Sequence, residues 1–171
     1  MSKDRPKKKI NARDLVEKIE ILTRKRIMAE EVVSLQSLHN LKKKPEVTTI
    51  LVVEDDESMR RALRRIFESE GYKVIVAQDA TELSDVFDDY SNSIHLILLD
   101  VGLPWVNGFE LAEMMKEHKD IKKIPIVFLS GHSDQEMIRR GFSVGADDYI
   151  TKPFELETVK RTIRTLLELQ S

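Results

Sequence analysis

The sequence predicts an α/β protein with a doubly wound, five-stranded parallel sheet, preceded by an α-helical extension. Two observations support this fold class. From Thr48 onward, short apolar runs alternate with longer segments of helical periodicity. Most of the short runs are apolar over consecutive residues rather than at every second residue, which is typical of parallel strands buried on both faces.

The individual elements follow from local pattern. A strand is expected at 49–53 (TILVV), followed by a helix at 57–70 that has Leu63 and Phe67 on one apolar face and ends before Gly71. The remaining strands are expected at 73–77, 94–99, 124–129 and 148–150, and the remaining helices at 81–90, 108–118, 134–142 and 155–169. Five alternating pairs fit the flavodoxin-like strand order 2-1-3-4-5.

Length and composition exclude several classes of protein. The chain has 171 residues, of which 41% are hydrophobic and 34% are charged, as in a globular domain with an extension. It has no cysteine, which excludes disulfides, thiolate metal sites and cysteine nucleophiles. No apolar run approaches the roughly 20 residues of a membrane helix, and the basic N-terminus lacks the apolar core of a secretory signal. We therefore expect a soluble, cytoplasmic protein.

Charge divides the chain near Pro45. Residues 1–46 hold 13 basic and 7 acidic side chains (13 − 7 = +6), whereas residues 47–171 hold 15 and 23 (15 − 23 = −8). We expect a basic, mostly helical N-terminal extension at 1–46 and one acidic domain at 47–171. The helical stripe of the extension is Ile21, Met28, Val32, Leu35 and Leu38.

The extension has several possible roles. A surface helix or a helix that forms a homodimer is the first expectation, because the apolar stripe lies on one helical face. Its positive charge also suits non-specific contact with nucleic acid. Docking to another protein or to an anionic membrane surface is a third alternative.

Reactive side chains gather at the predicted strand ends. In open α/β sheets, ligands bind beyond the carboxyl ends of the strands. Every strand except the second is followed by an acidic, hydroxyl or amine group. These residues are Glu54, Asp55, Asp56, Asp100, Ser130 and Lys152.

These groups suit phosphoryl transfer. Two carboxylates about 4–5 Å apart repel each other by roughly 3–4 kcal/mol at an effective dielectric near 20, so a cation between them is favoured. Oxygen ligands suit Mg²⁺. An aspartate can attack a phosphoryl group as a nucleophile, while the Lys152 ammonium stabilises the developing charge and the Ser130 hydroxyl donates a hydrogen bond.

Four separated stretches together resemble the receiver domain of two-component response regulators, including the chemotaxis regulators. They are ILVVEDDESMR (50–60), LILLDVGLPWVNG (96–108), IPIVFLSGH (124–132) and GADDYITKPF (145–154). The resemblance covers the chain from about Thr48 to its end. It implies a signalling domain that accepts phosphate from a histidine kinase or phosphotransfer protein and catalyses only its own phosphorylation and dephosphorylation. No output domain is expected after the last helix.

The resemblance also implies residue roles. Asp100 would be the phosphoacceptor, and the Mg²⁺ ligands would be Asp55, Asp100, the backbone carbonyl of Gly102 and, through water, Glu54. Lys152 would stabilise the phosphoryl group. Ser130 and Tyr149 would form the switch pair, and the Lys152–Pro153 peptide bond would be cis.

The same residues also allow interpretations that involve no phosphoryl transfer or a different function. The acidic run at 54–57 could simply cap a helix, and Tyr149 could be a plain packing aromatic. Trp105 is expected to be a loop residue. The positions of Gly102, which has no side chain, and His132 resemble those that set the dephosphorylation rate in the family, which leaves the phosphate lifetime open. An aspartate-nucleophile phosphatase would need a second acid two residues after Asp100, where Gly102 stands. A degenerate, constitutive scaffold is disfavoured because the strand-end groups are intact.

Overall fold

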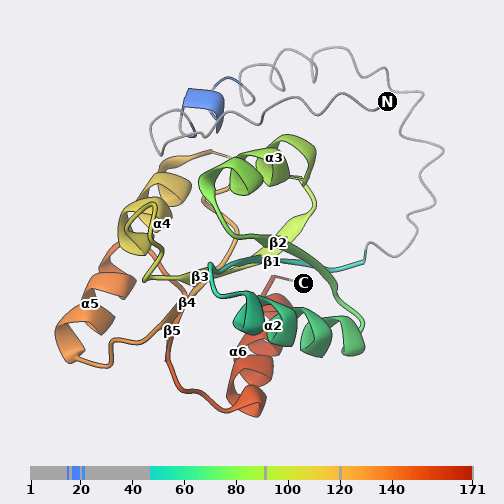
Figure 1. Cartoon of the computed structure of the whole chain (residues 1–171), viewed down its shortest axis with the longest axis vertical. Helices are drawn as coiled ribbons and strands as arrows, with labels where there is room; N and C mark the ends of the chain where they lie inside the picture. Colours follow the sequence, from blue (N-terminus) through green and yellow to red (C-terminus); the bar gives the residue numbers. More distant parts are fainter. Residues whose placement is uncertain are drawn as a thin grey trace.

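Five parallel strands form one sheet in the order β2-β1-β3-β4-β5, as predicted. The structure is a computed structural model, and it describes residues 15, 17–19, 21, 47–90, 92–119 and 121–170. Most of the N-terminal extension, including the stripe from Met28 to Leu38, lies outside the described residues. Helices α3, α4 and α5 cover one face of the sheet and α2 and α6 the other (Figure 1).

The elements alternate along the chain as expected. The strands are β1 (Thr49–Val53), β2 (Lys73–Ala77), β3 (Ile94–Asp100), β4 (Ile126–Ser130) and β5 (Asp148–Thr151). The helices are α2 (Glu57–Ser69), α3 (Ala80–Tyr90), α4 (Gly108–Glu117), α5 (Gln135–Ser143) and α6 (Leu156–Glu168). All neighbouring strands pair in parallel.

The apolar strands supply both layers of the core. In β3, Leu96 and Leu98 pack with Leu63 and Phe67 of α2, whereas alternate residues such as Leu99 pack toward α3 and α4. This alternation follows from the two-residue repeat of a strand. Because both faces are covered, most strand residues are apolar, and the polar residues of the site lie at the strand ends.

Two local details show how the chain sets its boundaries. Strand β4 begins at Ile126 rather than at the predicted residue 124, because Pro125 has no N–H for the ladder and Ile124 N–H donates to Ile121 O in a turn. Helix α2 ends as predicted, with Gly71 at φ +90°, a conformation that glycine adopts without a steric penalty.

Part of the N-terminal segment packs on the α3–α4 side of the sheet. Leu15 is fully buried in the same core cluster as Phe87 of α3 and Met115 of α4. The Lys18 ammonium pairs with Asp88 at 2.5 Å, and the carbonyl of Ile19 lies 3.3 Å from Nε2 of His118. These residues belong structurally to the α3–α4 layer.

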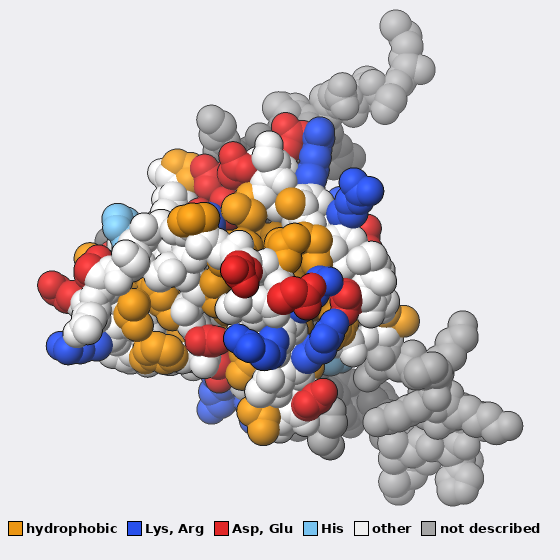
Figure 2. All heavy atoms as spheres, turned by 90° about the horizontal axis from the view of Figure 1, so that it is seen from below, with side chains coloured by type: hydrophobic (Ala, Val, Ile, Leu, Met, Phe, Trp, Pro, Cys, Tyr) orange, Lys and Arg blue, Asp and Glu red, His pale blue; other side chains and the backbone are white. Residues whose placement is uncertain are grey.

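The surface is mixed in charge. On the side of the molecule formed by α2 and α6, acidic and basic side chains are interspersed among apolar ones (Figure 2). Here Glu70 of the α2 C-terminus pairs with Lys160 and Arg164 of α6, which joins the two helices. Among the described residues, no helix is long and apolar enough to cross a bilayer.

Candidate functional site

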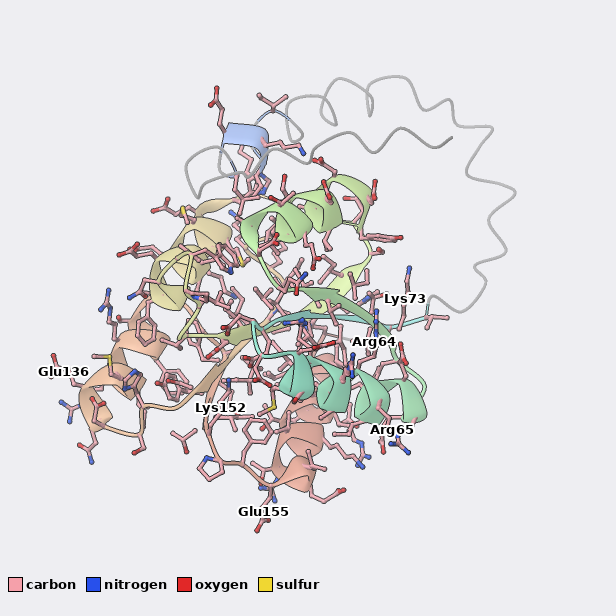
Figure 3. The ribbon with its side chains drawn as sticks, in the orientation of Figure 1. Arg64, Arg65, Lys73, Glu136, Lys152 and Glu155 are labelled. Atoms are coloured by element: carbon pink, nitrogen blue, oxygen red, sulfur yellow. The ribbon has the colours of Figure 1, made fainter. Side chains whose placement is uncertain are left out.

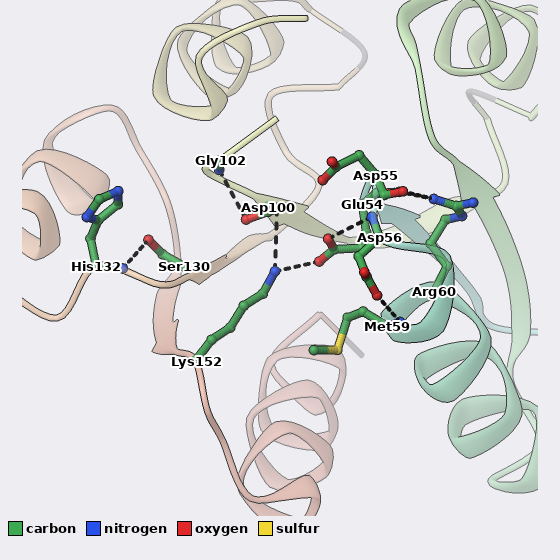
Figure 4. Close-up of polar contacts among 10 residues, drawn as sticks. All are labelled: Glu54, Asp55, Asp56, Met59, Arg60, Asp100, Gly102, Ser130, His132 and Lys152. Atoms are coloured by element: carbon green, nitrogen blue, oxygen red, sulfur yellow. Dashed lines mark hydrogen bonds and ion pairs between the residues drawn. The ribbon is translucent and has the colours of Figure 1, made fainter. Parts of the chain in front are cut away.

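Three carboxylates meet at the carboxyl ends of two neighbouring strands. Asp100 is the last residue of β3, and Glu54 and Asp55 directly follow β1. One oxygen from each of the three lies within 4.8 Å of the others. Glu54 and Asp100 are buried, whereas Asp55 is exposed. Figure 4 shows the three side chains converging on one point. An oxygen-only donor set of this kind fits a hard divalent cation.

Lys152 approaches the same point from the end of β5. Its Nζ donates to Oε2 of Glu54 at 2.7 Å and lies 3.4 Å from Oδ2 of Asp100. In Figure 3, Lys152 lies inside the molecule next to α2, whereas Glu136 and Glu155 lie at the periphery. One ammonium therefore bridges the two buried carboxylates, and the group of three carboxylates keeps a net negative charge.

Strand alternation explains this convergence. Glu54, Asp100 and Lys152 continue the series of strand residues that face α2 and α6, namely Val52, Leu98 and Ile150. The β4–β5 pairing extends one residue further, since Lys152 N–H donates to Ser130 O at 2.6 Å. Side chains separated by up to 98 positions are thereby placed in contact.

The loop after Asp100 is tightly held. The N–H of Gly102 donates to Oδ1 of Asp100 at 3.1 Å. A methyl group on Gly108, the first residue of α4, would lie 2.6 Å from the carbonyl oxygen of Asp100 and from Cα of Val101. Glycine at this position lets α4 begin directly against the end of β3, which fixes the backbone that carries Asp100.

The structure places Ser130 and Tyr149 on the other side of this edge. Ser130 is fully buried and, two residues after Phe128 in β4, lies on the same side of the strand, toward α5. The Oγ of Ser130 accepts a hydrogen bond from His132 N–H at 3.0 Å. The Tyr149 ring packs on Phe128, and its hydroxyl donates to His132 O at 3.0 Å. His132 is therefore the contact that both residues share, and among the described residues no hydrogen bond joins either one to Asp100.

Burial and charge shift two pKa values in the site. Burial raises the pKa of Glu54 above 4.5; the Lys152 hydrogen bond opposes this rise and the Asp100 charge adds to it. Burial alone would lower the pKa of Lys152 below 10.5, but the hydrogen bond and charge of Glu54, together with Asp100, raise it. Lys152 therefore stays cationic at neutral pH.

The raised pKa of Glu54 predicts a pH effect on stability. The folded protein binds this proton more tightly than the unfolded chain, so the resulting stability is full below pH 4.5 and is lost as the pH rises through the raised pKa. In EDTA, Glu54→Gln is expected to remove that decline. Urea unfolding over a pH series measures it, with exposed Glu57→Gln as the control; parallel pH curves for wild type and Glu54→Gln would contradict the assignment.

Sequence reasoning did not identify two residues beside the site. Arg60 of α2 donates to the carbonyls of Glu54 and Asp55, and Gln78 accepts from Arg60 at 2.9 Å. Gln78 could have been found from the sequence, because it is a polar residue directly after the predicted second strand. Asp56 caps the N-terminus of α2, which is one of the roles expected for the acidic run at 54–57. Its Oδ1 accepts a hydrogen bond from Met59 N–H at 2.7 Å.

Comparison with known proteins identifies the family of the chain. The family model for the response regulator receiver domain matches residues 50–164. The aerobic respiration control protein ArcA of Escherichia coli (strain K12) is 38% identical over 118 residues, covering 69% of this chain and 48% of ArcA. Response regulator RR06 of Streptococcus pneumoniae is 36% identical over 118 residues, covering 69% of this chain and 52% of RR06. The chain spans about half the length of these relatives.

Solved structures show the same fold. The chemotaxis response regulator CheY4 of Vibrio cholerae superposes with a TM-score of 0.64 at 28% identity, covering 70% of this chain and 98% of CheY4. The non-phosphorylated HemR receiver domain of Leptospira biflexa has a TM-score of 0.64 at 33% identity, with 70% and 94% coverage. Fold, site and family match together show that this chain belongs to the response regulator receiver domains of two-component signalling.

Proposed function

We propose that Asp100 is the phosphoacceptor of this receiver and that its phosphorylation changes protein–protein contacts. The observation that carries the proposal is the bridge from Lys152 to both Glu54 and Asp100, with Asp55 beside them. A nucleophilic carboxylate, a fixed cation and spare oxygen ligands are what phosphoryl transfer to a carboxylate needs.

The donor set fits Mg²⁺. Asp55, Asp100 and the carbonyl of Gly102 would hold the ion, with Glu54 acting through water. When bound, the ion supplies positive charge that offsets the charge on the transferred phosphoryl group. Asp55 is the one carboxylate of the three that is exposed, so it is accessible to an arriving cation.

The side chains have distinct tasks in the proposed step. A carboxylate oxygen of Asp100 forms a bond to phosphorus, the bond from phosphorus to the donor breaks, and its electron pair leaves with the donor group. In signalling, that group is a histidine ring nitrogen of a kinase or phosphotransfer protein, which takes up a proton from solvent. Lys152 holds its ammonium beside the phosphoryl oxygens, and Ser130 offers them its hydroxyl proton.

The contacts of Ser130 and Tyr149 suit a switch. Both touch His132 through its backbone, so a Ser130 hydroxyl drawn toward a phosphoryl group would disturb the contact that holds Tyr149. Moving an equilibrium from 1:99 to 99:1 takes about 5.5 kcal/mol. Two or three charge-assisted hydrogen bonds of about 1.5–3 kcal/mol each supply that.

Intact mass measured after incubation with acetyl phosphate tests the proposal. In this reaction the leaving group is acetate. Wild-type protein with Mg²⁺ is expected to gain one phosphoryl group, and Asp100→Asn or wild type in EDTA to gain none. A phosphoryl group on Asp100→Asn would contradict the proposal, as would Mg²⁺-independent phosphorylation of the wild type.

A further inference from the structure

Gln78, directly after β2, makes contacts from all its polar groups. Its backbone carbonyl accepts from Nε1 of Trp105 at 3.0 Å, and its Oε1 accepts from Arg60 at 2.9 Å. Its N–H and its Nε2 both donate to Glu82 of α3, at 3.1 and 2.7 Å. The residue after β2 therefore connects α2, α3 and the loop between β3 and α4.

Arg60 fixes the turn that carries the acidic residues. One of its guanidinium nitrogens donates to the carbonyls of both Glu54 and Asp55, and the other donates to Gln78 (Figure 4 shows the Asp55 bond). These carbonyls lie where the chain turns from β1 into α2. Among the described residues, the exposed Asp55 carboxylate has no hydrogen-bond partner, so its position depends on how this backbone is held.

Trp105 attaches the other side of the site to the same point. It lies in the loop between Asp100 and α4, where it is half-buried against the core. Its indole N–H is bound to Gln78, 27 positions away in the chain. The loop after Asp100 and the turn at Asp55 are thus tied to each other through the end of β2.

We propose that Arg60, Gln78 and Trp105 form a brace that sets the spacing of the Asp55 turn and the Asp100 loop for cation binding. Arg60 is a positioning residue in this brace. The inference rests on the proposed function, because it concerns the cation held by Glu54, Asp55 and Asp100. The proposal gives a role to the carboxyl end of β2, where the sequence shows no reactive side chain.

Charge and geometry act in opposite directions at Arg60. Its positive charge beside the site repels an arriving cation, so Arg60→Ala would combine a favourable and an unfavourable effect. Arg60→Lys keeps the charge but loses the planar fork that reaches Gln78 and the two carbonyls together. The lysine variant therefore isolates the positioning effect.

Calorimetric titration with Mg²⁺ tests the brace on the full chain. Arg60→Lys and Gln78→Ala are each expected to raise the Mg²⁺ Kd about 3- to 10-fold, and the double variant no further than the weaker-binding single variant, because the Gln78 side chain acts on the Asp55 turn through Arg60. Trp105→Phe, which keeps a ring but loses the N–H, is expected to weaken binding likewise. The thermal unfolding midpoints in EDTA should stay close to wild type.

Arg61→Lys is the matched control, since Arg61 is on the same helix and, within the described part of the chain, pairs only with Glu57. Its Kd should equal that of wild type. Wild-type affinity in Arg60→Lys, or single effects that add in the double variant, would overturn the brace while leaving the cation site intact. Wild-type protein that does not bind Mg²⁺ would overturn the cation site and the brace with it.

Discussion

Lys152→Met is expected to slow phosphorylation by acetyl phosphate about 100- to 1,000-fold, the loss seen when one preorganised charge-stabilising group is removed. The same substitution is expected to tighten Mg²⁺ binding. In the metal-free protein the Lys152 ammonium offsets part of the negative charge of Glu54 and Asp100, so its removal leaves three carboxylates within 4.8 Å without their cation. A divalent ion then relieves more repulsion than before.

Opposite changes in rate and affinity distinguish this role from damage to the fold, which would weaken both. The rate is the initial gain of phosphorylated mass, and the affinity is the calorimetric Kd. Lys160→Met serves as the control, because Lys160 also contacts two carboxylates, Glu70 and Glu157, but on α6 away from the site. If Lys152→Met reacts at the wild-type rate, Lys152 has no part in phosphoryl transfer.

Leu15→Ala is expected to lower the free energy of unfolding by about 2 kcal/mol, the low end of the range for a buried leucine. Leu15 is fully buried against the α3–α4 layer, and Lys18 and Ile19 add polar contacts to Asp88 and His118. The loss is limited because a terminal segment can detach instead of leaving a cavity. Urea unfolding measures the change.

Ile21→Ala provides the comparison within the same segment. Ile21 is 47% exposed, so its truncation is expected to cost less than about 0.5 kcal/mol. Equal effects of the two substitutions would mean that Leu15 does not pack on the α3–α4 layer in solution. Loss of stability in Leu15→Ala alone would mean that this part of the extension stabilises the receiver.

The fold was predictable because apolar, β-branched runs and amphipathic helices alternate without interruption from Thr48. The contact of Glu54, Asp100 and Lys152 was also predictable, because each follows or ends a parallel strand and the carboxyl ends of parallel strands lie at one edge of the sheet. The start of β4 was two residues off, because the apolar pattern continues through Ile124 while Pro125 interrupts the hydrogen-bond ladder.

The remaining features depend on side chains that reach across elements. Arg60 is four residues into a helix with several arginines, and nothing in its spacing separates it from Arg61, which faces solvent. The burial of Leu15 likewise depends on tertiary packing, whereas helical periodicity singled out Ile21, which is exposed. The roles of Ser130 and Tyr149, the homodimer and the nucleic-acid alternative stay predictions.

The most direct measurement is the chemical identity of the phosphorylated residue. Borohydride reduces an aspartyl phosphate to homoserine, so reduction of acetyl-phosphate-treated protein followed by peptide mass spectrometry locates the acceptor. Homoserine is expected at position 100 alone and only when Mg²⁺ is present. Homoserine at Asp55 or at another carboxylate, with residue 100 unchanged, would contradict it.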